Sequence, residues 1–203
     1  MKIRSLTALA LVGALALAAC GDDSDSSSTS SASTTALDQA TNDTTTPGAT
    51  FNDADVTFAQ GMIPHHEQAI EMADIALDPN VAAGDTVKEI ATRIQGAQDP
   101  EIELMKGWLA SWGQPEMGDT ADHDMSSMTG MMSAEDMDML ASLTGSEFDT
   151  MWMQMMIEHH EGAIAMAEDV KTAGQNTDVA LLADQIIAAQ TAEIAEMQAL
   201  LGG

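Results

Sequence analysis

Four long stretches of the chain repeat apolar residues every three or four positions, which is the spacing of an amphipathic helix. They cover residues 56–77, 85–112, 146–173 and 178–201, and a shorter stretch of the same kind covers residues 133–143. Acidic residues precede the first stretch, and proline or glycine follows the first three, as expected at helix boundaries. No alternating pattern typical of strands competes. The pattern therefore predicts an all-α protein.

Three local features refine these helices. The apolar stripe of the second helix keeps its phase across Pro100, which predicts a kink and not a break at that residue. Ser133 is placed to cap the short helix. Ser146, with Asp149 three residues later, predicts a capping box at the start of the third long helix.

The second half of the chain repeats the first. Residues 62–73 read MIPHHEQAIEMA and residues 156–167 read MIEHHEGAIAMA, while residues 98–109 match residues 190–201 in the same way. Each half is a pair of helices, and neither pair can bury its apolar face alone. The repeat predicts a four-helix bundle built from two repeated helical hairpins, with approximate two-fold symmetry.

The chain begins with features of an exported protein. Residues 1–19 combine a basic start with an apolar run too short to span a bilayer, and they precede Cys20 in a sequence that resembles a bacterial lipobox. We expect a signal peptide over 1–19, a lipid on Cys20, and a disordered Ser/Thr/Asp tether over 20–50. The remaining residues, 51–203, form the bundle domain, which contains a Met-rich linker over 113–145. The protein is then anchored to the outer face of a membrane in the cell envelope.

Charge and cysteine content exclude several classes of partner and site. The chain has 33 acidic and six basic residues, for a formal net charge of −27. Such an acidic protein is not expected to bind nucleic acid or to attach electrostatically to anionic lipid. Cys20 is the only cysteine, so neither a disulfide framework nor a thiolate metal site can be built.

The repeated histidine doublets carry the candidate chemistry. His65 and His66 in the first half, and His159 and His160 in the second, each follow a methionine three residues before the doublet and precede another six residues after it. The helical period places the first ring of each doublet on one face with these methionines. Where di-iron bundles have Glu-x-x-His, this chain has Met-x-x-His. Thioether and imidazole suit copper, Cu(I) above all, better than iron or zinc.

Two further groups of residues bear on this site. A polar stripe on the partner helices holds Gln98 and Glu101 in the first half and Gln190 and Glu193 in the second, as an outer shell to the imidazoles or as direct ligands. The linker offers a candidate accessory site in an exposed loop, where methionine has no core to fill. Its members are His123, Met125, Met128, Met131 and Met132.

The repeated Met-x-x-His-His-x-x-Ala-Ile-x-Met-Ala, with Phe148-Asp149 before the second copy and Gln-x-x-Glu-Ile-x-x-Met in the partner helices, resembles the ferritin-like domain of unknown function family 305. The resemblance covers residues 53–201. It implies a four-helix bundle, export, and copper binding through histidine and methionine, as in some bacterial members. The metal ligands that it implies are Met62, His65, His66, Met72, Met156, His159, His160 and Met166.

The sequence thus favours a lipid-anchored copper-binding protein that buffers, chaperones or confers resistance, and is not an enzyme. Its expected partners are the metal ion, the membrane through the lipid, and a second copy of the chain or other metal-trafficking proteins. One alternative is a ferritin-like di-metal oxidase that uses iron or manganese with Glu101, Glu193 and the histidines. The other binds no metal and uses a buried His/Glu network to specify the bundle.

Overall fold

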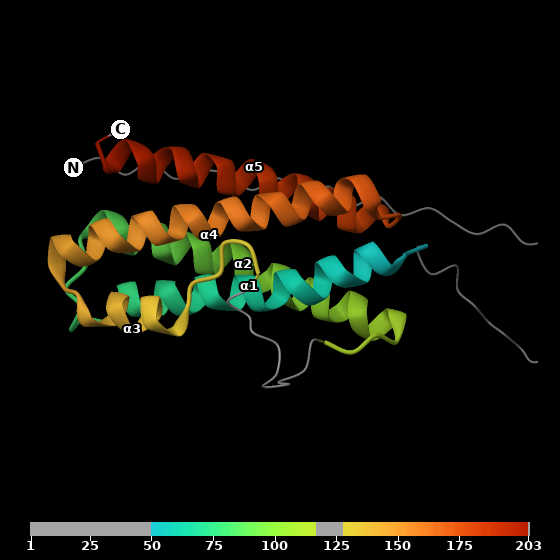
Figure 1. The fold of residues 1–203 in the computed structure, drawn as a ribbon, viewed down its shortest axis with the longest axis horizontal. Coiled ribbons are helices and arrows are strands. Elements are labelled where there is room, and N and C mark those ends of the chain that lie inside the picture. Colours follow the sequence, from blue (N-terminus) through green and yellow to red (C-terminus); the bar gives the residue numbers. More distant parts are fainter. Residues whose placement is uncertain (1–49, 117–127, 203) are drawn as a thin grey trace, which may run out of the picture. The chain divides into compact units, whose positions relative to one another are not determined.

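The computed structural model describes residues 50–116 and 128–202, which belong to one folded unit. Its elements are α1 (Asp53–Leu77), α2 (Asp85–Trp112), α3 (Ala134–Ser142), α4 (Gly145–Ala173) and α5 (Thr177–Leu200) (Figure 1). Within these residues there is no strand, so the predicted all-α class is confirmed. The predicted boundaries agree to within three residues at every helix end.

The helices form two hairpins that meet through their first members. α1 packs along α2, α4 packs along α5, and α1 also packs against α4. The α3 helix lies against α4 (Figure 1). Apolar side chains between the hairpins form two core clusters, one around Trp152 and Phe148 and one around Phe58 and Leu109. The α1/α4 contact is therefore the interface along which residues from the two halves of the sequence meet.

Capping explains most of the helix starts. The Asn52 side chain accepts hydrogen bonds from the first amides of α1, and Asn176 does the same for α5. Ser133 forms the predicted cap of α3 with Asp136. The capping box predicted for Ser146 and Asp149 is wrong, because α4 starts one residue earlier and has Thr144 at its cap. Asp149 instead accepts a hydrogen bond from the Gly84 amide at 2.9 Å, at the start of α2.

Asp55 plays the same role for the other hairpin. Its carboxylate is fully buried and accepts hydrogen bonds from the backbone amides of Gln175 at 3.0 Å and Asn176 at 3.2 Å. It also accepts one from the Asn52 amide at 2.9 Å. A Cβ on Gly174 would lie 2.5 Å from this carboxylate, so only glycine allows the approach. Each hairpin thus supplies an aspartate that holds the turn of the other.

Both prolines inside the long helices are accommodated. α1 continues through Pro64, and α2 continues through Pro100 without a break, as predicted. None of the helices described is both long enough and apolar enough to cross a bilayer. The predicted signal peptide, Cys20, nearly all of the tether, and the linker residues His123 and Met125 lie outside the described residues.

Candidate metal centre

The four helical histidines lie in the interior of the domain. His65 and His66 on α1 and His159 and His160 on α4 have no exposed surface. The rings of His65 and His159 meet across the helix interface, with their centroids 3.8 Å apart and their planes inclined by 44°. The second ring of each doublet turns toward its own hairpin. The structure thus brings the first histidines of the two doublets together, as the helical faces predicted.

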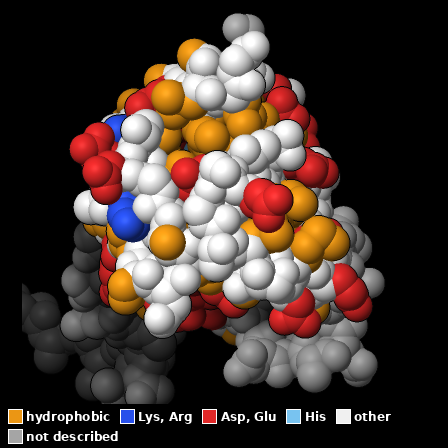
Figure 2. Space-filling view, turned by 90° about the vertical axis from the view of Figure 1, so that its left-hand side faces the viewer, with side chains coloured by type: hydrophobic (Ala, Val, Ile, Leu, Met, Phe, Trp, Pro, Cys, Tyr) orange, Lys and Arg blue, Asp and Glu red, His pale blue; other side chains and the backbone are white. Residues whose placement is uncertain are grey.

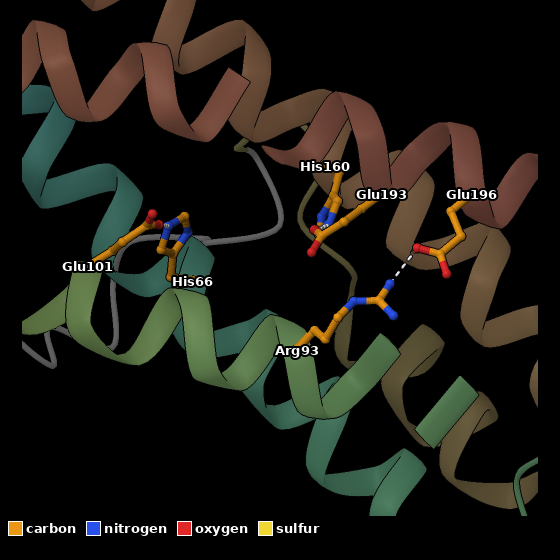
Figure 3. Close-up of polar contacts among 6 residues, drawn as sticks. All are labelled: His66, Arg93, Glu101, His160, Glu193 and Glu196. Carbon is orange, nitrogen blue, oxygen red and sulfur yellow. Dashed lines mark hydrogen bonds and ion pairs between the residues drawn. The ribbon is translucent and has the colours of Figure 1, made fainter. Parts of the chain in front are cut away.

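The second histidine of each doublet is held by a glutamate of the partner helix. His66 Nε2 lies 2.7 Å from Glu101 on α2, and His160 Nε2 lies 2.8 Å from Glu193 on α5 (Figure 3). Donation from Nε2 to a carboxylate fixes the orientation of an imidazole and leaves the Nδ1 lone pair free in the neutral ring. These contacts place both glutamates beside the imidazoles, as expected of an outer shell. The two His–Glu contacts are separate and belong to different hairpins (Figure 3).

The buried imidazole nitrogens are largely without hydrogen-bond partners. Among the described residues none pairs with Nδ1 of any of the four rings, nor with Nε2 of His159. The buried carbonyl oxygens of Gln98 and Gln190 are unpaired as well. A buried polar atom without a partner costs about 1–3 kcal/mol. Three of these nitrogens belong to the His65/His159 pair, and they fit a site for a cation that binds nitrogen lone pairs.

Burial keeps the central pair neutral. Loss of hydration, followed by the nearby His66, lowers the pKa of His65 from 6.5 to about 3. Loss of hydration, together with the adjacent His65, also lowers the pKa of His159 well below its usual value. A neutral imidazole offers a lone pair, whereas an imidazolium does not. Protons therefore do not compete for these two rings near neutral pH.

This neutrality predicts a pH dependence of the metal-free protein. Below pH 6.5 the unfolded chain protonates both rings, whereas the folded chain leaves His65 neutral down to about pH 3. The free energy of unfolding therefore decreases as the pH is lowered below 6.5, by up to about 1.4 kcal/mol per pH unit for each ring. Urea unfolding in a chelator at pH 6.5, 5.7 and 5.0 should show this loss. The double variant H65L/H159L is the control, and an equal slope in it contradicts the prediction.

The methionines of the repeated motif separate into two groups. Met62, Met72 and Met156 are fully buried within the two hydrophobic clusters, where they pack as core residues. Met166 is partly exposed and lines a cavity between the start of α1 and the end of α4. The full burial of the first three is also expected of methionines that only fill space in an apolar core. Their role as ligands, like that of Met166, stays a prediction.

The described end of the Met-rich linker is not an exposed loop as predicted, because residues 128–132 dock on the bundle beside the histidines. The Gln68 side chain bonds both backbone groups of Met132, accepting from N at 2.7 Å and donating to O at 3.0 Å. The Thr129 carbonyl lies 3.3 Å from His65 Nε2. Met132 is 8% exposed.

Two glycines permit this close docking. A Cβ on Gly162 would stand 2.2 Å from the Thr129 carbonyl oxygen, and one on Gly130 would stand 2.8 Å from the Gly162 Cα. Gly130 also has a positive φ of 82°. Gly162 lies inside the long helix α4, and a glycine at such a position is the sequence signal that another backbone approaches there.

A site of nitrogen and oxygen ligands alone is not formed. Across residues 50–116 and 128–202, no three His, Cys, Asp or Glu side chains converge so as to hold a metal ion. His65 and His159 form a pair, while Glu101 and Glu193 are engaged by different rings. A metal ion bound by this pair would be coordinated by two nitrogens alone, or by these two nitrogens together with thioether sulfur. Such donors suit soft cations and not iron or manganese.

Fold and site together define an all-α protein of two matched hairpins around a buried histidine pair. The chain belongs to the DUF305 family, described as a domain of unknown function, whose family model matches residues 55–201. The family predicted from the repeated motif is thereby confirmed. A comparison with curated proteins finds no match.

Solved structures of similar proteins share the fold. A DUF305 fragment from Deinococcus radiodurans is 33% identical with a TM-score of 0.67, covering 77% of this chain and 99% of that one. A DUF305 protein from Streptomyces coelicolor is 29% identical with a TM-score of 0.64, covering 73% and 92%. CopM in its Cu(II)-bound form is 34% identical with a TM-score of 0.61, covering 73% and 95%. CopM has also been solved with Cu(I) and with Ag bound.

Proposed function

We propose that this protein binds copper outside the cytoplasm and serves to buffer it, to pass it on, or to confer resistance to it. The observation that carries the proposal is the His65/His159 pair, which is buried, neutral and rich in unpaired nitrogens. The similarity to CopM, a protein solved with copper and silver bound, gives it independent support. Cu(I) is the expected cargo, because imidazole and thioether are its preferred biological ligands in a chain with one cysteine.

The residues around the pair have distinct proposed roles. His65 and His159 supply the central nitrogen ligands, and His66 and His160 offer their Nδ1 atoms from either side. Glu101 and Glu193 hold those outer rings and place negative charge close to the cation. No oxidation or hydrolysis step is required of any of them. The proposed activity is binding and release, and not catalysis.

The proposed location rests on the first residues of the chain. The signal peptide over residues 1–19 would carry the protein across the membrane, and the lipid on Cys20 would hold it at the outer face. The end of the domain seen in Figure 2 carries several scattered groups of Asp and Glu side chains and few Lys or Arg. Such a surface attracts cations and raises their local concentration.

The decisive experiment removes the central pair. We expect the variant H65L/H159L to lose at least about 100-fold in Cu(I) affinity, measured anaerobically by competition with a chromogenic Cu(I) chelator. Single variants E101Q and E193Q, which loosen only the outer rings, should lose about 10-fold to 100-fold. A double variant that binds Cu(I) as tightly as the wild type contradicts the proposal.

The same proteins separate the two rival functions. A di-metal oxidase would bind Fe(II) and consume oxygen, and E101Q and E193Q would abolish both effects. A bundle that uses its histidines only as a hydrogen-bond network would bind no metal, and H65L/H159L would lower its stability. We expect the metal-free double variant to be as stable as the wild type or more so, because three of the four ring nitrogens that leucine replaces have no partner, and the fourth, His65 Nε2, has only the Thr129 carbonyl at 3.3 Å.

A further inference from the structure

Two methionine side chains from different parts of the chain lie beside Gly61, one helical turn before His65. The methyl carbon of Met128, which is bonded to its sulfur, lies 3.2 Å from the point where a Cβ on Gly61 would stand. The sulfur of Met166 lies 3.7 Å from the same point. Met128 comes from the docked segment and Met166 from α4, so their meeting depends on the tertiary structure.

The two halves of the repeat differ at the positions where these groups meet. When His65 is aligned with His159, Gly61 corresponds to Met155 and Gly162 corresponds to Gln68. Gly61 leaves space for the two methionines, and Gly162 leaves space for the backbone of Thr129 and Gly130. Gln68 binds the backbone of Met132. These three departures from symmetry serve the docking of residues 128–132 on one side of the histidine pair.

The docking fixes the position of Met128. Its neighbour Thr129 is within 3.3 Å of His65, and the segment is held four residues later through Met132. Met128 itself is partly buried, as is Met166. Two thioethers held near Gly61 by the packing of their segments are soft donors in a fixed arrangement, unlike methionines on a free loop.

A surface cavity leads to Met166. It has a volume of about 380 Å³ and is lined by the first turns of α1 and the last turns of α4, including Phe58 and Met166. The carboxylates of Asp53 and Asp169 also line it. A cation attracted by these carboxylates would meet the Met166 side chain as its first soft donor. Met166 therefore belongs both to the wall of this cavity and to the pair of thioethers.

We propose that Met128 and Met166 form a second soft-metal site, distinct from the histidine pair, which takes up Cu(I) or Ag(I) arriving through the α1/α4 cavity. This inference rests on the proposed copper binding and adds to it a sulfur site shared between the Met-rich segment and the bundle. Capture is by coordination only, with no change in oxidation state.

The test uses leucine in place of each methionine, a change that keeps side-chain volume and removes sulfur. The full-length wild type, M128L, M166L and M128L/M166L are loaded with Cu(I), and the metal is counted. X-ray absorption then gives the ratio of sulfur to nitrogen ligands. M139L is the matched control, because Met139 is on α3 and 50% exposed. Thermal unfolding of the metal-free proteins checks that each variant folds.

We expect M128L/M166L to lose one bound Cu(I) and most of the sulfur signal, while the nitrogen signal of the histidine pair remains and M139L matches the wild type. Each single variant should weaken the sulfur site about 10-fold or more. A double variant with the full metal count and an unchanged sulfur signal would refute the shared site but leave the histidine proposal intact. A wild type that binds no Cu(I) overturns both.

Discussion

The substitution D55A is expected to lower the free energy of unfolding by about 3–5 kcal/mol. Asp55 is fully buried and accepts hydrogen bonds from the backbone amides of Asn52, Gln175 and Asn176. Alanine leaves these amides without an acceptor, in the turn that joins α4 to α5 as well as at the start of α1. Urea unfolding of the metal-free protein, followed by circular dichroism, measures the loss.

The repeat supplies the control for this prediction. D149A removes the equivalent carboxylate, but Asp149 is only partly buried and accepts from a single amide, that of Gly84. We expect it to cost about 1–2 kcal/mol. If D55A were no more destabilising than D149A, the burial of Asp55 and its additional amide partners would add nothing to the free energy of unfolding, which contradicts the prediction.

The second large effect is expected from G162A. The added methyl group would stand 2.2 Å from the Thr129 carbonyl oxygen and 2.8 Å from the Gly130 Cα, so residues 128–132 must move away. Detachment breaks both Gln68 bonds and exposes Met132, and we expect a loss of about 2–3 kcal/mol in the free energy of unfolding. Limited proteolysis should cut this segment faster in G162A than in the wild type.

G96A is the matched substitution, because Gly96 is also inside a long helix but has no atom within 4 Å of its added Cβ. Alanine there should raise stability by about 0.5–1 kcal/mol through helix propensity alone. Opposite signs for the two glycines would show that contact with the docked segment decides the result. A stabilising G162A would mean that residues 128–132 do not dock against α4.

The helices could be predicted from the sequence because their apolar positions repeat over many turns. The inward direction of the histidines could be predicted for the same reason, since His65 and His159 share a face with apolar neighbours. Asp149 was misassigned because a serine three residues before an acidic residue matches the capping-box pattern. Its true partner, the Gly84 amide, is 65 positions away in the sequence.

The methionines show a second limit of sequence reasoning. Met62, Met72 and Met166 all flank a histidine doublet in the motif. Periodicity alone therefore gives no reason to treat one of them as a core residue and another as a metal ligand. Only tertiary packing places the first two among core residues and the third beside Met128. The docking of residues 128–132 was equally hidden, because their composition is that of a solvated loop.

The exchange of aspartates between the hairpins bears on the origin of the chain. Asp55 on α1 holds the turn between α4 and α5, Asp149 on α4 holds the turn between α1 and α2, and the central imidazoles meet where the halves face each other. Two separate copies of one hairpin could make all of these contacts across a rotation axis, since such an axis pairs every group with its mate's equivalent. The domain thus has the geometry of a fused homodimer. Fusion would have allowed the two copies to diverge. One side of the histidine pair then gained Gly61, Gly162 and the docked residues 128–132, while the equivalent positions, Met155 and Gln68, have larger side chains.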